Sequence, residues 1–267
     1  MAITVGIPSK GVNQSTLRVV DLALSLSGVS EILVTINPGI DSATFPAEVI
    51  SNQRVIVTFH QSDLGLYGNF RYLVQASTSE KFMWLCTDDS PSSDLDKLSD
   101  AMNKHESILA IPTWCWAEYR PDTCSFDAKS KRGVYPPSNI SDNYVLAAIN
   151  PEPSWIFGLW DTKFLRRAIP KYDFDWLDVH LLQQALLSKK VLNVDTESVM
   201  TIGTWNWANK KPYSISNSGP YSLKAVLYQL WLLPKFLRFG RFGFFNVIRR
   251  IRSLIHQSKQ LRVIRSQ

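Results

Sequence analysis

The chain has 267 residues, of which 45% are hydrophobic, 12% aromatic and 19% charged. This length and composition suit one large or two small folded domains, and they exclude a disordered, collagen-like or coiled-coil protein. Three cysteines in no zinc-binding spacing favour a reducing compartment over a disulfide framework. No apolar stretch reaches the roughly 18 to 20 residues that span a bilayer, so we expect no membrane-crossing helix. Residues 1–20 lack a charged region followed by an apolar one, so we expect no signal peptide.

The net charge of +6 is unevenly distributed along the chain. All 23 acidic residues lie at or before Glu197, whereas residues 198–267 contain 12 of the 29 Lys and Arg residues and no acid. From Phe244 to His256, apolar side chains recur at helical spacing opposite a basic face. Such basic amphipathic helices are typical of segments that lie in the headgroup plane of anionic lipid.

We therefore expect residues 234–267 to contact an anionic membrane surface, with packing of this helix on the rest of the protein as the alternative. Nucleic acid is not expected as a partner, because no RNA- or DNA-binding motif accompanies the basic residues. The charge pattern places a catalytic domain at 1–197 and a basic, aromatic-rich helical extension at 198–267.

Strand-like and helix-like segments alternate along the first 111 residues. Strands are expected at 3–8, 31–36, 53–59, 81–86 and 107–111, and helices at 15–26, 69–76 and 95–105. This alternation predicts an α/β fold with a mostly parallel sheet that helices cover on both faces. Ligands bind such sheets at the carboxyl ends of the strands.

The second half of the expected catalytic domain, residues 112–197, begins with a segment that has no clear period. Residues 112–153 are rich in Pro, Trp, Asp and Ser, which predicts an irregular functional excursion. Aromatic side chains in and after this segment either line an acceptor site or belong to the core, and the pattern leaves both open: Trp114, Trp116, Tyr119 and residues 155–160. A helix is expected from about 178 to 190.

Two acidic groups carry the possible chemistry. Asp88 and Asp89 directly follow an apolar strand, which favours either a shared divalent cation or a capped turn. Three further acids surround Trp176 at the start of the last expected helix, where an acid either caps the helix or serves as a general base: Asp173, Asp175 and Asp178. The chain lacks a glycine-rich phosphate loop, a nucleophile elbow and a paired-histidine zinc motif.

Four segments resemble, in order, the family-2 glycosyltransferases of GT-A fold. They are ITVGIPSKG at 3–11, EILVTINPG at 31–39, YGNFRYLVQASTSEKFMWLCTDDSPSSD at 67–94 and DFDWLDVHLLQQALLSKKVLNV at 173–194. The third is the most specific, since an Asn-Phe pair, a helix, an aromatic-rich strand and an Asp-Asp pair are typical of that family. The resemblance covers about residues 1–195 and implies a Rossmann-like GT-A sheet flanked by helices.

The resemblance also implies roles for individual residues. It assigns five residues to the nucleotide-sugar pocket: Pro8, Ser9, Asn37, Asn69 and Asp88. It assigns Asp89 as the metal ligand and Asp178 as the catalytic base, with Asp175 as the second choice for the base. The chain departs from the family in three places. Asn37 replaces an aspartate that contacts the nucleoside, Ser90 replaces a third acid, and no histidine occurs around Met200 to Trp205.

The implied activity is an inverting transfer of a sugar from a nucleotide-diphospho-sugar to a hydroxyl of a glycan or lipid-linked acceptor. The resemblance implies Mg²⁺ or Mn²⁺ as cofactor. With the basic segment, it implies surface polysaccharide or glycoconjugate synthesis by a cytoplasmic protein peripheral to the inner face of the cell membrane. The alternatives are a nucleotide-sugar-binding protein with a degraded site, a nucleotidyltransferase and a polyanion-binding protein acting through the basic segment.

Overall fold

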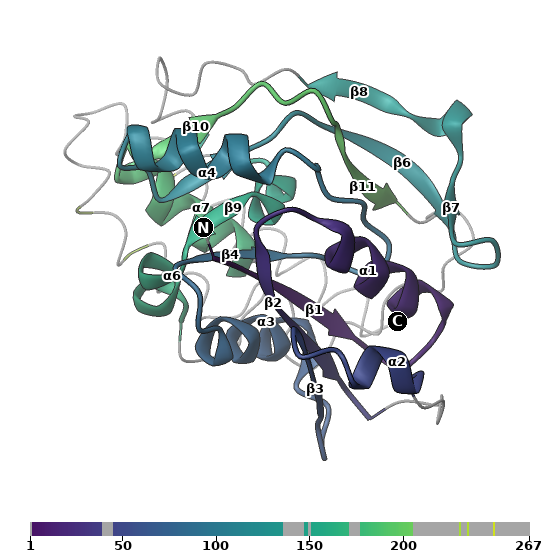
Figure 1. Ribbon diagram of the computed structural model, residues 1–267. Helices are drawn as coiled ribbons and strands as arrows, with labels where there is room; N and C mark the ends of the chain where they lie inside the picture. The colour runs from purple at the N-terminus through teal and green to yellow at the C-terminus, as the bar shows by residue number, and fades with distance from the viewer. Residues whose placement is uncertain are drawn as a thin grey trace, which may run out of the picture.

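The computed structural model describes residues 2–38, 45–135, 147–148, 151–170 and 177–204, together with three isolated positions, Leu230, Pro234 and Ile248. The described residues build one large and one small sheet (Figure 1). The large sheet has seven strands in the order β10-β5-β9-β4-β1-β2-β3. Its strands are β1 (Ile3–Ser9), β2 (Val29–Ile36), β3 (Val55–Phe59), β4 (Lys81–Trp84), β5 (Leu109–Ile111), β9 (Leu159–Asp161) and β10 (Val191–Asn193).

Strand β9 is antiparallel to both of its neighbours, β4 and β5, whereas the other strand pairs of this sheet are parallel. The helices that connect and cover the strands are α1 (Gln14–Ser25), α2 (Ala47–Ile50), α3 (Gly65–Ala76), α4 (Leu95–Lys104), α6 (Thr162–Ala168) and α7 (Leu177–Leu187). Two short 3-10 helices, η1 (Ala128–Ser130) and η3 (Pro153–Phe157), complete this part of the chain. The expected α/β fold with a mostly parallel sheet is confirmed.

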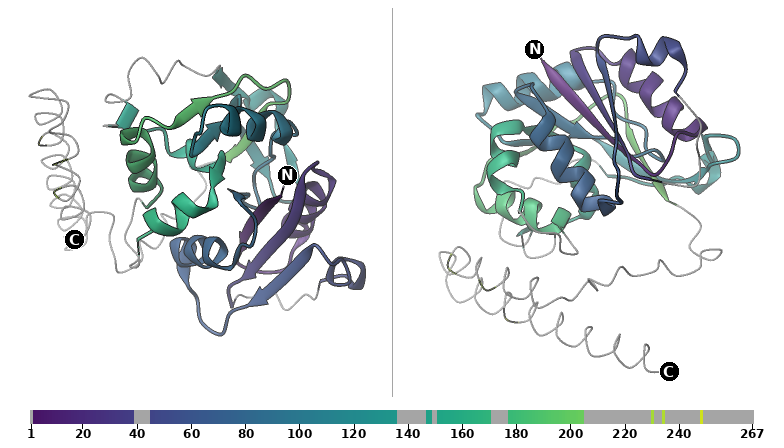
Figure 2. Two further views of the ribbon diagram at one scale, coloured as in Figure 1. Left: turned by 60° about the vertical axis from the view of Figure 1, so that its left-hand side comes forward. Right: turned by 90° about the horizontal axis from the view of Figure 1, so that it is seen from below.

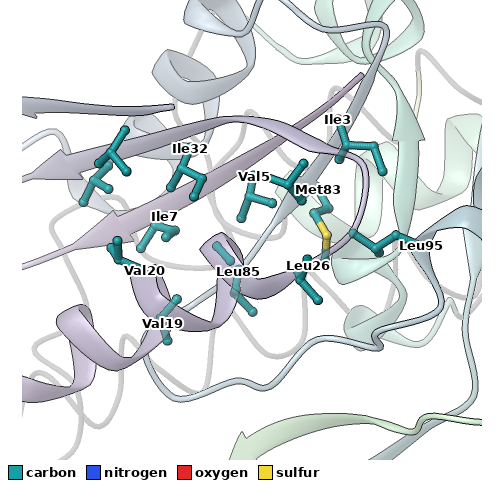
Figure 3. Close-up of a cluster of buried hydrophobic side chains, with 14 of the residues drawn as sticks. Ile3, Val5, Ile7, Val19, Val20, Leu26, Ile32, Met83, Leu85 and Leu95 are labelled. Atoms are coloured by element: carbon teal, nitrogen blue, oxygen red, sulfur yellow. The ribbon is translucent and has the colours of Figure 1, made fainter. Parts of the chain in front are cut away.

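Alternation of side chains along the strands divides the core between the two faces of the sheet. On β1, Ile3, Val5 and Ile7 point to one face, where α1 and α4 add their apolar residues (Figure 3). On β4, Phe82 and Trp84 point to the opposite face, which α3, α6 and α7 cover. Both faces are therefore buried, as the continuous apolar strands predict.

The expectation of an irregular excursion over 112–153 is wrong for its first part. Residues 114–135 contain the small sheet, with β6 (Trp114–Arg120), β7 (Ser125–Phe126) and β8 (Arg132–Tyr135), and β11 (Met200–Thr204) pairs with β6 in parallel. From Cys115 to Arg120 burial alternates residue by residue, as in a half-exposed strand, but the sequence hides this alternation because Trp116, on the more exposed face, is apolar as well.

Residues 200–204, which the charge pattern groups with the basic extension, thus form a strand of the small sheet. The amphipathic helix expected at 244–256 lies outside the described residues except for Ile248. Within the part of the chain that the structure describes, no helix is long and apolar enough to cross a membrane.

Candidate functional site

A short acidic loop, residues 86–90, follows β4 at the carboxyl end of the parallel strands. The backbone N–H of Asp89 donates to the carbonyl of Cys86 at 3.1 Å and closes a turn. Ser90 then forms an antiparallel bridge with Thr201 of β11, with N–H···O distances of 2.8 and 2.9 Å. The two predicted acids therefore lie between β4 of the large sheet and β11 of the small sheet.

The Asp89 side chain is turned inward, with only 3% of its surface exposed. Its Oδ1 accepts the N–H of Gly203 at 3.0 Å, and its Oδ2 accepts the N–H of Cys86 at 3.3 Å. Burial, and next the charge of Asp88, raise the pKa of Asp89 well above its usual value. Asp89 therefore anchors the acidic loop to β11.

Three possible metal-binding atoms meet in this loop. The Cys86 sulfur and one carboxylate oxygen each from Asp88 and Asp89 all lie within 4.8 Å of one another. Burial and the two neighbouring acids raise the pKa of the Cys86 thiol. A divalent cation would offset the proximity of two carboxylates, and each Asp89 oxygen keeps a second lone pair beside its amide bond. The two carboxylates suit Mg²⁺ or Mn²⁺, whereas Cys86, which its raised pKa keeps as a neutral thiol, adds little to the binding of either ion.

Cys86 was not among the residues that the sequence assigned to the metal. The feature of the sequence that could have indicated Cys86 is its position three residues before Asp89, between the end of the strand and the turn.

Gly203 of β11 packs directly against the backbone of the acidic loop. A Cβ at this position would lie 2.1 Å from the Asp88 carbonyl oxygen, closer than any side chain can approach backbone. Gly203→Ala should therefore displace the loop or the strand and lower the melting temperature by about 5 °C. A matched control is Gly65→Ala, where φ is +66° but no atom lies within 4 Å, so only the conformational cost of roughly 1 kcal/mol applies. Equal melting temperatures for the two variants would contradict this tight approach.

The predicted base, Asp178, lies in the first turn of α7. Its Oδ1 accepts the N–H of Val179 at 2.8 Å, and Tyr67 of α3 also donates a hydrogen bond to the carboxylate. Burial outweighs these bonds and raises the pKa of Asp178 to about 6. A carboxylate with this pKa is ionised near neutral pH yet basic enough to accept a proton.

A chain of aromatic contacts connects Asp178 with the strand that carries the acidic loop. Tyr67 packs edge-on against Phe70, with ring centroids 6.2 Å apart, and Phe70 stacks on Trp84 at 5.0 Å. Trp84 is the last residue of β4. The predicted base and the acidic loop are thus attached to one aromatic cluster, although they come from distant parts of the sequence.

The two residues assigned to the nucleotide pocket at the end of β1 are both buried, and the Ser9 side chain is bonded within the turn that follows the strand. The Ser9 hydroxyl donates to the Gly11 carbonyl at 2.7 Å and lies 2.9 Å from the Thr16 hydroxyl. Pro8 is buried in β1 beside Thr35 of β2. Both residues shape the turn that leads into α1.

Asn37, at the carboxyl end of β2, has a carboxylate as its neighbour. Its Nδ2 donates to Asp63 at 2.5 Å, and its Oδ1 accepts the N–H of Leu64 at 3.3 Å. The same Asp63 oxygen accepts the N–H of Gly65 at 2.7 Å, at the start of α3. The fold thus places a carboxylate beside Asn37. The sequence analysis did not identify Asp63. The only feature that could have indicated it is the position of an acid just before a helix.

Asn69 is buried in α3, and its Nδ2 donates to the carbonyl of Gly65 at 2.9 Å. Its Oδ1 has no hydrogen-bond partner among the described residues. A buried amide oxygen in this state retains acceptor capacity for a donor group. Asn69 accordingly stays a candidate for the nucleotide pocket.

The structure decides the open question about the aromatic residues. Trp114, Tyr119 and Trp160 are at least 95% buried and belong to the core, whereas Trp116 and Trp155 are only partly buried. The second choice for the base, Asp175, and its neighbour Asp173 lie outside the described residues.

Comparison with known proteins bears on the fold. No protein-family model and no curated sequence matches the chain. The structure of S. aureus TarS 1–349 in complex with UDP-GlcNAc matches with a TM-score of 0.64 and 12% identity over 89% of this chain and 67% of that chain. The UDP complex of the same fragment matches with a TM-score of 0.60 and 11% identity over 89% and 66%. The structure of TarS matches with a TM-score of 0.59 and 10% identity over 89% and 40%.

TarS is a glycosyltransferase of GT-A type. This chain has the GT-A fold. The chain spans about two thirds of the TarS fragment and 40% of TarS itself. Identities of 10 to 12% support a shared fold and do not extend to a shared acceptor or pathway.

Proposed function

We propose that this protein is an inverting glycosyltransferase that transfers a sugar from a nucleotide-diphospho-sugar to a hydroxyl of a glycan or lipid-linked glycan. The observation that carries the proposal is a GT-A fold in which an acidic loop follows β4, and in which Asp178, a partly buried carboxylate whose pKa is about 6, is connected to the same strand through the Tyr67 and Phe70 side chains. TarS binds UDP-GlcNAc and UDP, which makes a uridine nucleotide-sugar the first donor to test.

In this proposal the acidic loop receives the diphosphate end of the donor. Asp88 and Asp89, with Cys86 beside them, would hold Mg²⁺ or Mn²⁺. The bound cation supplies neutralising charge for the leaving diphosphate. The protein's own contribution is to hold the loop rigidly through the Gly203 and Thr201 backbone bonds, so that the donor binds in one orientation.

Asp178 acts as the base. Its ionised carboxylate accepts the proton of the acceptor hydroxyl as that oxygen attacks the anomeric carbon and the nucleoside diphosphate leaves. Because one displacement occurs, the anomeric configuration inverts. The N–H of Val179 and the Tyr67 bond hold the carboxylate in place.

The basic, acid-free residues after Thr204 support a membrane-bound acceptor. They would bring the enzyme to anionic lipid at the cytoplasmic face, where a lipid-linked glycan of surface polysaccharide synthesis is presented.

Flotation with anionic liposomes should carry the full chain but not a 1–233 truncation if residues 234–267 make this contact.

Binding of UDP-GlcNAc with Mn²⁺ should raise the melting temperature, since a ligand at 100 times its Kd stabilises the folded state by about 2.7 kcal/mol. The measurement is thermal unfolding with UDP-, GDP-, CMP- and dTDP-sugars, each with and without Mn²⁺, followed by assay of sugar-nucleotide hydrolysis. A shift with no hydrolysis or transfer would favour a degraded nucleotide-sugar-binding protein, an alternative that Asn37 and the inward turn of Asp89 also favour. No shift with any sugar nucleotide would contradict the proposal.

A further inference from the structure

Arg18 of α1 reaches across to the acidic loop and binds its backbone. Its Nη2 donates to the carbonyl oxygens of Thr87 at 3.0 Å and Asp89 at 2.8 Å. One nitrogen therefore holds two carbonyls that lie on either side of Asp88. Bonds from a charged donor are roughly twice as strong as neutral ones, so this contact restrains the loop more than an ordinary turn bond does.

The guanidinium of Arg18 is itself held in place by the small sheet. Its central carbon lies 5.0 Å from the ring centroid of Tyr119 and 5.6 Å from that of Phe126. The Tyr119 hydroxyl donates to Ser15 at 2.7 Å, one turn before Arg18 on the same helix. Cation–π contacts on two rings and a fixed helix leave the side chain little freedom.

We propose that Arg18 is a positioning residue that fixes the backbone of the acidic loop, and thereby the spacing of the Cys86, Asp88 and Asp89 donor atoms. Three elements distant in sequence, α1, the loop after β4 and the β6–β7 hairpin, meet at this one guanidinium. The effect of Arg18 on metal binding rests on the proposed function, but the effect of Arg18 on the loop backbone does not.

The loop has built-in probes of this effect. The N–H groups of Asp89 and Ser90 make the turn and the bridge to β11, so their hydrogen exchange reports opening of the loop. Loosening the loop should also scatter the donor atoms. The loss of a residue that orients metal ligands typically lowers metal affinity by 10- to 100-fold.

Arg54 provides a matched control. It is partly buried like Arg18, and it also donates to two backbone carbonyls, those of Val29 at 3.2 Å and Leu24 at 3.0 Å, away from the acidic loop. Arg18→Met and Arg54→Met therefore each remove two charged hydrogen bonds to backbone carbonyls. Only the first should affect the loop.

The experiment measures amide exchange of residues 86–90 by mass spectrometry and Mn²⁺ affinity by electron paramagnetic resonance, on the full chain of each variant. Arg18→Met should speed loop exchange at least tenfold and raise the Mn²⁺ dissociation constant by about 10- to 100-fold, whereas Arg54→Met should change neither. Arg18→Lys should recover part of both losses, because a single charged nitrogen makes both bonds.

Unchanged loop exchange in Arg18→Met would overturn the proposal, and so would equal effects of the two methionine variants. Tighter Mn²⁺ binding in Arg18→Met would also overturn it, since Arg18 would then only repel the cation. If the wild-type chain binds no Mn²⁺ while Arg18→Met still loosens the loop, the positioning role is upheld and the metal assignment in the proposed function fails.

Discussion

Asp178→Asn should lower the turnover of the sugar nucleotide by about 10²- to 10⁴-fold, because asparagine cannot accept the acceptor's proton. The substitution keeps the size of the side chain and an acceptor oxygen for the Val179 N–H. The measurement is kcat and KM for the donor identified by the binding panel. Donor KM should change little, since the base contacts the acceptor.

The pH dependence of the wild-type enzyme should carry the same signature. With an Asp178 pKa of about 6, turnover should rise tenfold per pH unit below pH 6 and become level above it. The pH profile of Asp178→Asn should not show this rise in turnover below pH 6. A loss of activity in Asp175→Asn in place of Asp178→Asn would assign the base to Asp175.

As the pH rises through about 6, the stability of the fold should fall while turnover rises. A carboxyl whose pKa is raised in the folded state favours folding when protonated, so its contribution is fully present below about pH 4 and is lost as the pH rises through about 6. Above pH 6 the ionised carboxylate costs up to about 3 kcal/mol. Asp178→Asn should therefore raise the melting temperature at pH 8 and leave it nearly unchanged at pH 4.

Asp88→Asn and Asp89→Asn should each lower metal-dependent turnover by about 10²-fold or more, because the charge that opposes the leaving diphosphate is no longer held in place. Excess Mn²⁺ should restore part of the activity of Asp88→Asn by mass action. The two variants should differ in stability. An asparagine at 89 would direct its NH₂ group at the N–H of Gly203 or of Cys86 and leave a buried donor unpaired, at a cost of about 1 to 3 kcal/mol.

The control for these variants is Asp100→Asn, the same chemical change on an exposed position of α4. It should leave turnover and Mn²⁺ dependence unchanged. Wild-type turnover that is insensitive to EDTA would contradict a metal role for the acidic loop, whatever the variants do.

The prediction of the large sheet from the sequence was close to the structure because its signals are local. Strands 3–8, 31–36 and 53–59 are short apolar segments bounded by turn residues, and the observed β1, β2 and β3 differ from them by at most two residues at either end. The small sheet was missed. One partner of β6, β11, lies about 85 residues further along the chain, where no local pattern records it. The nearer partners β7 and β8 have only two and four residues, which is too short for a clear strand pattern.

The candidate site shows the same division. Asp88 and Asp89 are adjacent in the sequence and follow a strand, so their place at the sheet edge was predictable. Their partners were not. Gly203 and Arg18 reach the acidic loop from 114 and 71 residues away, and both contacts exist only in the folded protein.

Taken alone, the amino-acid sequence determined the α/β layering, the position of two adjacent acids after a strand and the separation of an acidic first part from a basic last part. These properties follow from residue order, which sets periodicity and local charge. Only the tertiary structure decided that Asp89 faces inward, that Asp63 stands beside Asn37 and that burial brings the pKa of Asp178 to about 6. The physical reason is that burial and hydrogen-bond partners depend on residues far apart in the chain, and these meet only in the folded protein.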